Sequence, residues 1–175
     1  MHAKYPNVFS PIKLGPVELP NRFYSSPHAV PMNILGKPTD DFIHYNVART
    51  RGGCGLLILS MAAHGRVRSV WPNIGPAEHV AAFRALTDAV HGAGGKIFGE
   101  PWYFWGLPGQ WAPLSPPAPA LGPSVGQFRF HDKGWATREM STEDIRRMLG
   151  TFSQATVNLL EAGFESGDIE RILEL

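Results

Sequence analysis

The stretch Arg51–Met61, RGGCGLLILSM, gives the clearest indication of how this 175-residue chain folds. Its apolar end, LLILSM, is a short run bounded by glycine, which is typical of a β-strand buried on both faces. A helix should precede this strand, because the pair Thr39-Asp40 offers an N-cap and the pair Gly52-Gly53 offers a stop. The order of helix, glycine stop and buried strand is one step of an α/β fold.

The same order recurs on both sides of this stretch. Arg22–Ser26 is a short strand candidate, and Lys96–Glu100 predicts a third strand after a helix expected over residues 77–91. Ser141 should begin a third helix, ending at Gly163, because Asp144 completes a pattern like a capping box. The inward faces expected of the three helices are Phe42, Tyr45 and Arg49; Val80, Phe83, Leu86 or Thr87, and Val90; and Ile145, Met148, Leu149, Phe152, Ala155 and Leu159.

The connections indicate the architecture and its working side. Ile12–Leu19 is a hairpin candidate with Gly15-Pro16 at its turn, and Pro101–Met140 is expected to be one long loop. Strands that alternate with helices predict right-handed crossovers and a parallel sheet. The long loops follow strands, and in α/β barrels function lies on that side. The residues alone therefore predict part of an α/β barrel, without naming a reaction.

Composition excludes several classes of function. The formal net charge is +1, with no basic cluster, which argues against nucleic-acid binding. No run of about 18 apolar residues predicts a membrane span. The single cysteine, Cys54, fits a reducing compartment, so a cytoplasmic protein is expected. The 7 histidines show no metal-ligand spacing, and the glycines of RGGCG precede a strand, unlike those of a dinucleotide-binding loop.

Four segments carry a resemblance to a known family: residues 9–28 (FSPIKLGPVELPNRFYSSPH), 44–64 (HYNVARTRGGCGLLILSMAAH), 94–102 (GGKIFGEPW) and 141–164 (STEDIRRMLGTFSQATVNLLEAGF). Together they resemble the N-terminal portion of the old yellow enzyme, or NADH:flavin oxidoreductase, family. Residues 22–24 and 27–28 follow its trimethylamine dehydrogenase and 2,4-dienoyl-CoA reductase branch. The resemblance implies α/β structure: the N-terminal part of an FMN-binding TIM (β/α)8 barrel, with an N-terminal β-hairpin that plugs its floor.

The resemblance also implies a cofactor site at the strand ends. Ser26 and Pro27 would lie under the edge of a bound FMN, with the backbone of Ala29 nearby. Met61 would contact the isoalloxazine ring. Glu100 would hydrogen-bond the polar pyrimidine edge of the flavin, because a carboxylate accepts from N–H groups. Without the resemblance, Glu100 would be interpreted as a surface carboxylate.

Two residues are catalytic candidates under the same resemblance. His28 faces the substrate as a proton donor or anion partner, or else it packs the loop after the first strand. Tyr103 would line the substrate pocket together with His64, Trp102 and Trp105, and the alternative is loop packing.

Three departures from the family pattern modify these expectations. Ala29 stands where the branch has a cysteine bonded to FMN, so non-covalent FMN is expected. Met61 replaces a tyrosine of an amine-binding aromatic bowl, which argues against an alkylamine substrate. After Phe164 the pattern is lost, so residues 1–175 are expected to form a single incomplete domain, family-like over 8–164 and divergent over 165–175. This would be a truncated or frameshifted fragment, cut near strand 4 and inactive alone.

Three functions remain open at this point. The first is an FMN-dependent NAD(P)H:acceptor oxidoreductase, or its N-terminal portion, with a small-molecule substrate. The second is a non-catalytic half-barrel that assembles with a complementing chain or a second copy, or has no function. The third is a barrel hydrolase or aldolase, which is weakest because the expected strands end in no Lys or His pair suited to that chemistry.

Overall fold

The structure is a computed structural model that describes residues 4–28, 30–63, 70–103, 120–130 and 133–165. Its centre is a parallel sheet with the strand order β3 (Tyr24–Ser25), β6 (Leu56–Ala62) and β7 (Lys96–Trp102). This confirms the three predicted strands and their parallel pairing, although β3 is shorter than the predicted Arg22–Ser26.

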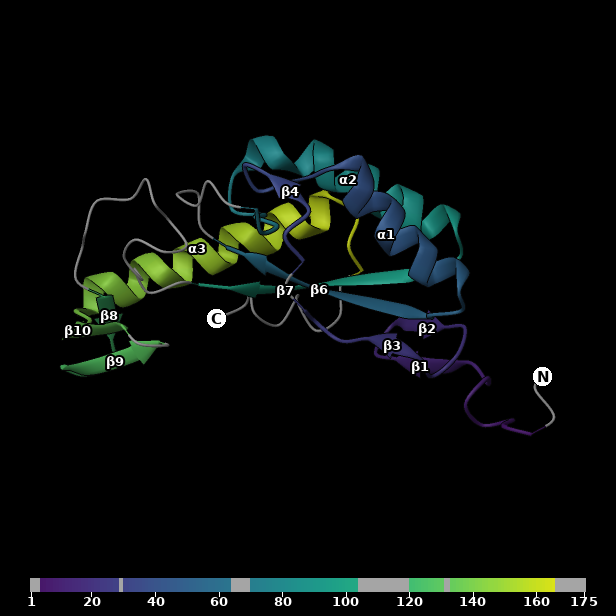
Figure 1. Cartoon of the computed structure of the whole chain (residues 1–175), viewed down its shortest axis with the longest axis horizontal. Helices are drawn as coiled ribbons and strands as arrows, with labels where there is room; N and C mark the ends of the chain where they lie inside the picture. The colour runs from purple at the N-terminus through teal and green to yellow at the C-terminus, as the bar shows by residue number, and fades with distance from the viewer. Residues whose placement is uncertain (1–3, 29, 64–69, 104–119, 131–132, 166–175) are drawn as a thin grey trace.

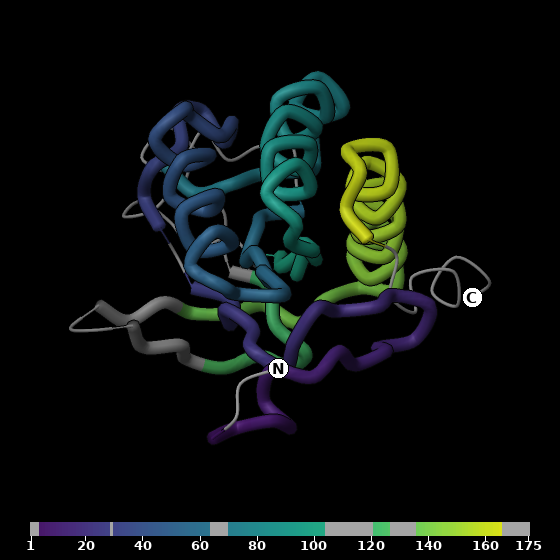
Figure 2. Tube along the Cα trace, turned by 90° about the vertical axis from the view of Figure 1, so that its right-hand side faces the viewer, coloured from purple at the N-terminus to yellow at the C-terminus, as the bar shows by residue number. Residues whose placement is uncertain are grey.

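Three helices cover one face of this sheet: α1 (Asp40–Arg51), α2 (Val80–Gly92) and α3 (Thr142–Glu161). The helices lie side by side above the strands (Figure 2). A short 3₁₀ turn, η1 (Ala77–His79), leads into α2. The strands of the central sheet alternate with the helices along the chain, as in a parallel α/β fold.

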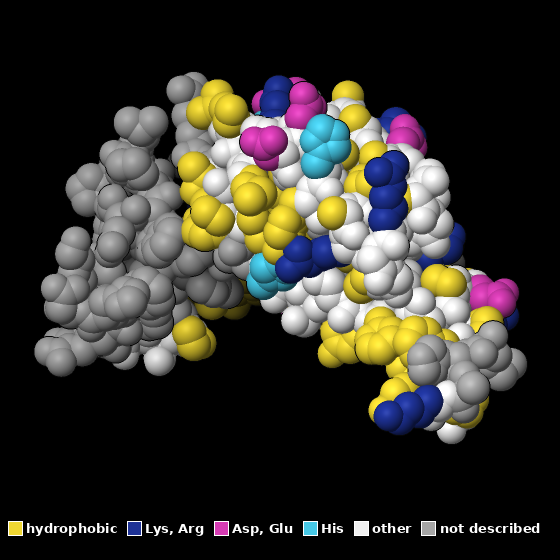
Figure 3. Space-filling model, turned by 45° about the vertical axis from the view of Figure 1, so that its right-hand side comes forward, with side chains coloured by type: hydrophobic (Ala, Val, Ile, Leu, Met, Phe, Trp, Pro, Cys, Tyr) yellow, Lys and Arg dark blue, Asp and Glu magenta, His cyan; other side chains and the backbone are white. Residues whose placement is uncertain are grey.

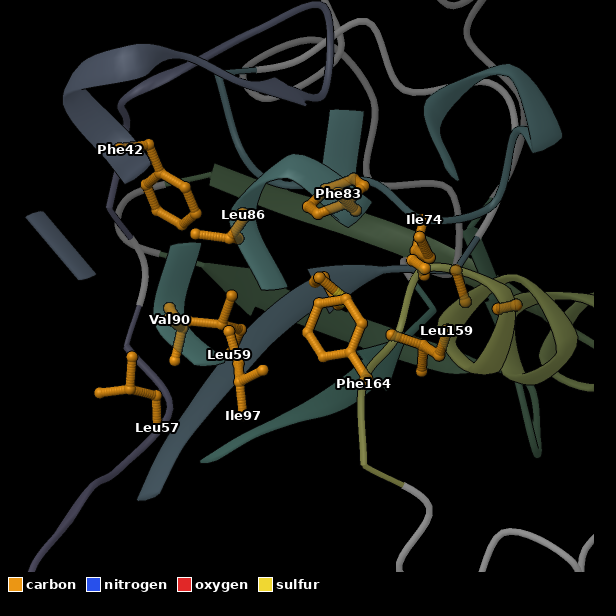
Figure 4. Close-up of a cluster of buried hydrophobic side chains, with 14 residues drawn as sticks. Phe42, Leu57, Leu59, Ile74, Phe83, Leu86, Val90, Ile97, Leu159 and Phe164 are labelled. Carbon is orange, nitrogen blue, oxygen red and sulfur yellow. The ribbon is translucent and has the colours of Figure 1, made fainter. Parts of the chain in front are cut away.

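The core lies between the helices and the sheet. Figure 4 shows side chains from the strands and from α2 and α3 pointing toward one another. Phe83 of α2 and Ile97 of β7 are fully buried, and the ring of Phe164 lies 6.3 Å from that of Phe83. Burial of such side chains is the main force that holds the three βα steps together.

Three further groups of strands surround this core. β1 (Ile12–Leu14) and β2 (Val17–Leu19) form the predicted antiparallel hairpin. β4 (Asn33–Ile34) and β5 (Lys37–Pro38) form a second hairpin inside the loop after β3, with Gly36 at a φ of +84°. That hairpin was not predicted from the sequence.

The prediction of one long loop over Pro101–Met140 is wrong. β8 (Ala120–Gly122), β9 (Gly126–Phe130) and β10 (Lys133–Glu139) form a separate sheet in the order β8-β10-β9. β9 and β10 pair in antiparallel register, and β8 joins β10 in parallel. The sequence did not predict this sheet, because the many prolines before β8 are typical of loops and not of strands.

The helix caps were predicted correctly, but two helix faces were not. Thr39 caps α1, and Ser141 forms a full capping box with Asp144. In α1, however, the buried side chains beside Phe42 are Asn46, Val47 and Thr50, so Tyr45 and Arg49 lie on a neighbouring, half-buried face. In α3, Ala155 and Leu159 are buried as predicted, whereas Ile145 and Leu149 are exposed.

The described strands do not close a barrel. The central sheet has three parallel strands, and the chain after α3 reaches the free edge of β7, where the Glu165 N–H donates to the Ile97 carbonyl at 3.1 Å. The Glu165 carboxylate accepts from the Ile97 N–H at 2.7 Å and lies 3.3 Å from the Lys96 ammonium. Glu165 therefore lies where a fourth strand would begin to pair with β7.

Candidate functional site

The side chains of β6 alternate between the two faces of the central sheet. Leu57, Leu59 and Met61 belong to the cluster under the helices. Because successive side chains of a strand point in opposite directions, Ile58 and Ser60 lie on the other face. Both are half-buried.

The side chains of β7 divide in the same way. Ile97 is in the helix-side cluster, and a Cβ atom added to Gly99 would meet the side chain of Leu159 in α3. Phe98 and Glu100 therefore point to the face without helices. We call the surface formed by Ile58, Ser60, Phe98 and Glu100 the open face.

Strand register brings two polar residues together on the open face. Ser60 pairs with Glu100 across β6 and β7, near the carboxyl ends of both strands. Glu100 is exposed, and within the described part of the chain its carboxylate has no hydrogen bond or ion pair. A carboxylate beside a hydroxyl, neither of them hydrogen-bonded to another described side chain, is a group available for recognition.

The tip of β3 adds a second hydroxyl. Ser25 pairs with Leu57, so the next residue, Ser26, leaves the sheet one position further along and is exposed. Pro27 follows it and is half-buried. Since carboxyl ends of parallel strands meet at one edge of a sheet, Ser26, Ser60 and Glu100 all lie toward the side where α/β barrels bind ligands.

This donor and acceptor set fits the polar edge of a flavin. The pyrimidine edge of an isoalloxazine ring presents an N–H donor between two carbonyl acceptors. The Glu100 carboxylate can accept from the N–H, and the hydroxyl of Ser60, on the neighbouring strand, can donate to the adjacent carbonyl. The exposed Glu100 makes this fit possible, because a carboxylate already paired inside the protein could not accept from a ligand.

The family resemblance implies a flavin contact for Met61, near the carboxyl end of β6. Its exposed fraction is 0%, and its side chain packs in the cluster between sheet and helices. The run LLILSM is apolar at all positions but one, so the sequence does not show which alternate residues face the helices. Met61 and its neighbour Ser60 lie on opposite faces of β6. Ser60 was not among the predicted site residues, yet it is the one polar side chain in that run and lies on the open face.

His28 is held by two neighbours. Its Nδ1 lies 3.0 Å from the Ser26 carbonyl oxygen, and its Nε2 lies 2.7 Å from the Tyr45 hydroxyl in α1. A carbonyl oxygen only accepts, so Nδ1 carries the proton and, in the neutral ring, Nε2 accepts from Tyr45. Both ring nitrogens of His28 therefore have a partner within the protein.

Tyr103 lies just beyond β7, against α3. Its ring centroid is 6.3 Å from that of Phe152, at an interplanar angle of 45°. Trp102, the last residue of β7, is half-buried and lies on the same side of the strand as Glu100. Ala29, His64 and Trp105, which were also implied for the site, lie outside the described residues.

In the ranges that the structure describes, no three or more His, Cys, Asp or Glu side chains gather in a way that could hold a metal ion. No helix in those ranges is both long and apolar enough to cross a membrane.

Comparison with known proteins gives a family match over nearly the whole chain. The model of the NADH:flavin oxidoreductase / NADH oxidase family matches residues 7–170. An NADPH dehydrogenase from Listeria welshimeri serovar 6b is 32% identical over 164 residues, which are 90% of this chain and 46% of that protein. The chain spans between about a quarter and about a half of the length of the curated relatives that it matches.

Solved structures give the same fold. The old yellow enzyme homologue from Zymomonas mobilis superposes with a TM-score of 0.73 and 25% identity, over 92% of this chain and 47% of that one. Histamine dehydrogenase from Rhizobium sp. 4-9 superposes with a TM-score of 0.77 and 21% identity, over 93% of this chain and 24% of that one. The three βα steps described above therefore correspond to the N-terminal part of such barrels.

Proposed function

Because this chain belongs to the NADH:flavin oxidoreductase / NADH oxidase family, we propose that it forms the N-terminal part of the FMN site of an NAD(P)H:acceptor oxidoreductase. The observation that carries the proposal is the pairing of Ser60 with Glu100 on the open face, beside the exposed Ser26. Bound FMN would supply hydride transfer between NAD(P)H and a small-molecule acceptor.

The residues of this chain would bind and orient the flavin rather than react with it. Glu100 would accept a hydrogen bond from the pyrimidine N–H, and Ser60 would donate to the adjacent carbonyl oxygen. Ser26, two strands away from Glu100, would contact the ring further along. Pro27 would pack against the ring edge. Each polar contact made away from bulk water is stronger than the same contact in solution, so the half-buried position of Ser60 favours binding.

The proposal is tested by titrating the whole chain with FMN and following flavin fluorescence and absorbance. Glu100→Ala should weaken binding about tenfold to a hundredfold, since a hydrogen bond to an ionised group contributes about 1.5–3 kcal/mol. Glu100→Gln should lose less, because the amide oxygen still accepts. Glu139→Gln is the matched control, since Glu139 is an exposed carboxylate on β10, far along the chain from the open face.

Two outcomes would contradict this function. One is a wild-type chain that binds no FMN at micromolar concentration. The other is FMN that binds equally well to wild type and Glu100→Ala, which would place the flavin elsewhere.

A second candidate function is a half-barrel that assembles with a complementing chain or a second copy. Apolar side chains of the N-terminal region are exposed, including Phe23 at 47% and Tyr24 at 62%. Figure 3 shows hydrophobic side chains gathered along the lower right edge, where the N-terminal region projects. Surfaces of this kind favour association. Sedimentation velocity across a range of concentrations, with and without FMN, would separate a monomer that binds flavin from an assembly that forms without it.

A further inference from the structure

We propose that Tyr45, supported by Arg49, is a positioning residue that fixes the Ser26–Pro27 tip of β3 by holding His28 in one tautomer. The inference rests on the proposed FMN site, because that tip is one of the three segments offered to the flavin. It assigns to α1 a role at the site, although no residue of α1 contacts the open face.

The tip of β3 needs a support other than the sheet. β3 contributes two residues to the parallel ladder, Tyr24 opposite Leu56 and Ser25 opposite Leu57. In the part of the chain that the structure describes, pairing ends there, so Ser26 and Pro27 continue without a ladder. An unpaired backbone segment of this kind would sample several conformations and would not present a fixed hydroxyl.

His28 supplies that support through its own backbone and through α1. Its Nδ1–H donates to the Ser26 carbonyl at 3.0 Å, which closes a tight loop around Pro27. Its Nε2 accepts from the Tyr45 hydroxyl at 2.7 Å, and the two rings meet edge to face with centroids 6.0 Å apart. If Tyr45 did not donate, the ring could carry its proton on Nε2, and the Ser26 carbonyl would lose its donor.

Tyr45 can act in this way because it stands on a rigid element. Its helix is anchored by Phe42 and Val47, which are 2% and 7% exposed. The guanidinium carbon of Arg49 lies 3.9 Å from the centroid of the Tyr45 ring, on the same face of α1 one turn later. A cation over the ring draws electron density from it, and this makes the phenol a stronger donor to His28.

The contacts form one connected series from α1 to the site. Arg49 stacks on Tyr45, Tyr45 donates to His28, and His28 donates to the carbonyl of Ser26. Hydrogen bonds arranged in sequence polarise and strengthen one another. Arg49 contributes a cation to this series, at the face of the Tyr45 ring.

The test uses Tyr45→Phe, which removes one hydroxyl and keeps the ring. The nitrogen-15 chemical shifts of the His28 ring, measured in the whole chain without ligand, should show one Nδ1–H tautomer in wild type. In Tyr45→Phe they should move toward a mixture of tautomers. FMN affinity should fall about threefold to tenfold, the range expected for loss of one hydrogen bond. Tyr5→Phe is the matched control, because Tyr5 lies in the N-terminal segment before β1, and it should change neither measurement.

A second pair of variants guards against a simple folding defect. Arg49→Ala should move the His28 shifts in the same direction as Tyr45→Phe, by a smaller amount, and Arg49→Lys should restore them in part because it retains the cation. A role confined to packing would leave the tautomer unchanged in all of these variants.

The outcomes separate this inference from the proposed function. Unchanged His28 shifts in Tyr45→Phe, or a wild-type ring protonated on Nε2, would overturn the positioning role even if FMN binds well. FMN binding that Tyr45→Phe leaves unaltered would overturn it as well. A wild-type chain that binds no FMN, yet shows the expected tautomers, would instead contradict the proposed function.

Discussion

The helix side of the central sheet and the open face come from the same strands but differ in how far their side chains are buried. On the helix side, Leu57, Met61 and Ile97 have exposed fractions of 1%, 0% and 0%. On the open face, Ser60 is half-buried and Glu100 is exposed. The period of two in a β-strand thus assigns stability to one face and recognition to the other. Substitutions on the two faces should therefore affect different measurements.

The largest difference should appear between two isoleucines on opposite faces. Ile97→Ala removes a fully buried side chain from the helix-side cluster and should lower the free energy of unfolding by about 3–4 kcal/mol. Ile58→Ala makes the same chemical change on the open face, where the side chain is half-buried, and should lower it by at most about 2 kcal/mol. Urea unfolding followed by circular dichroism gives both values.

An equal decrease in the free energy of unfolding for Ile97→Ala and Ile58→Ala would contradict the difference between the two faces. It would mean that the open face is packed as tightly as the helix side, either by residues outside the described ranges or by a partner. In that case Ser60 and Glu100 would not be accessible to a ligand.

Replacing two glycines by alanine should change the free energy of unfolding by smaller amounts, and in opposite directions. A methyl group on Gly99 would overlap the side chain of Leu159, which is itself 1% exposed and has little room to move. Gly99→Ala should therefore lower the free energy of unfolding by about 1–3 kcal/mol. Gly150 is an exposed glycine inside α3 with nothing within 4 Å of its added Cβ, so Gly150→Ala should raise it by up to about 1 kcal/mol.

Thermal unfolding of the two glycine variants checks the sign directly. A stabilising Gly99→Ala would mean that α3 does not press on β7 at that point. The helix-side surface of β7 would then be looser than its burial indicates.

Local signals in the sequence were sufficient for most of the fold. The apolar run Leu56–Met61, the glycines after α1 and the pair Ser141 and Asp144 each predicted an element that the structure confirms. These signals work because caps, stops and buried strands depend on neighbouring residues. The family resemblance was equally well founded, since the family model matches residues 7–170.

The remaining features depend on contacts that neighbouring residues do not reveal. An apolar run such as LLILSM is hydrophobic at every position but one, so it did not show that Met61 faces the helices and Ser60 the open face. The buried side of α1 uses Asn46 and Thr50, polar residues whose side chains donate to backbone carbonyls one turn earlier. The contact between His28 and Tyr45 joins residues that lie 17 positions apart. Only the tertiary structure supplies these relations.

The smallest effect is expected where α3 extends beyond the sheet. Its first turns lack a core, since Ile145 and Leu149 are 39% and 56% exposed, so the cap should hold them instead. Ser141→Ala removes the acceptor for the Asp144 N–H and should lower the free energy of unfolding by about 1 kcal/mol. The amide protons of residues 142–146 should exchange faster, while those of β6 and β7 should not change.

Acid should loosen the same end of α3. The Arg138 guanidinium, and then the N–H and hydroxyl of Ser141, hold the pKa of Asp144 well below its ordinary value near 3.8. A carboxyl whose pKa is lower in the folded state stabilises that state above its unfolded pKa, and this contribution is lost as the pH falls further. Protection of the first turn of α3 should therefore be constant from pH 7 to about 5 and decline below about 4. Asp144→Asn should abolish that decline. A decline that persists in the variant would show that another carboxylate, rather than the cap, holds this end of the helix.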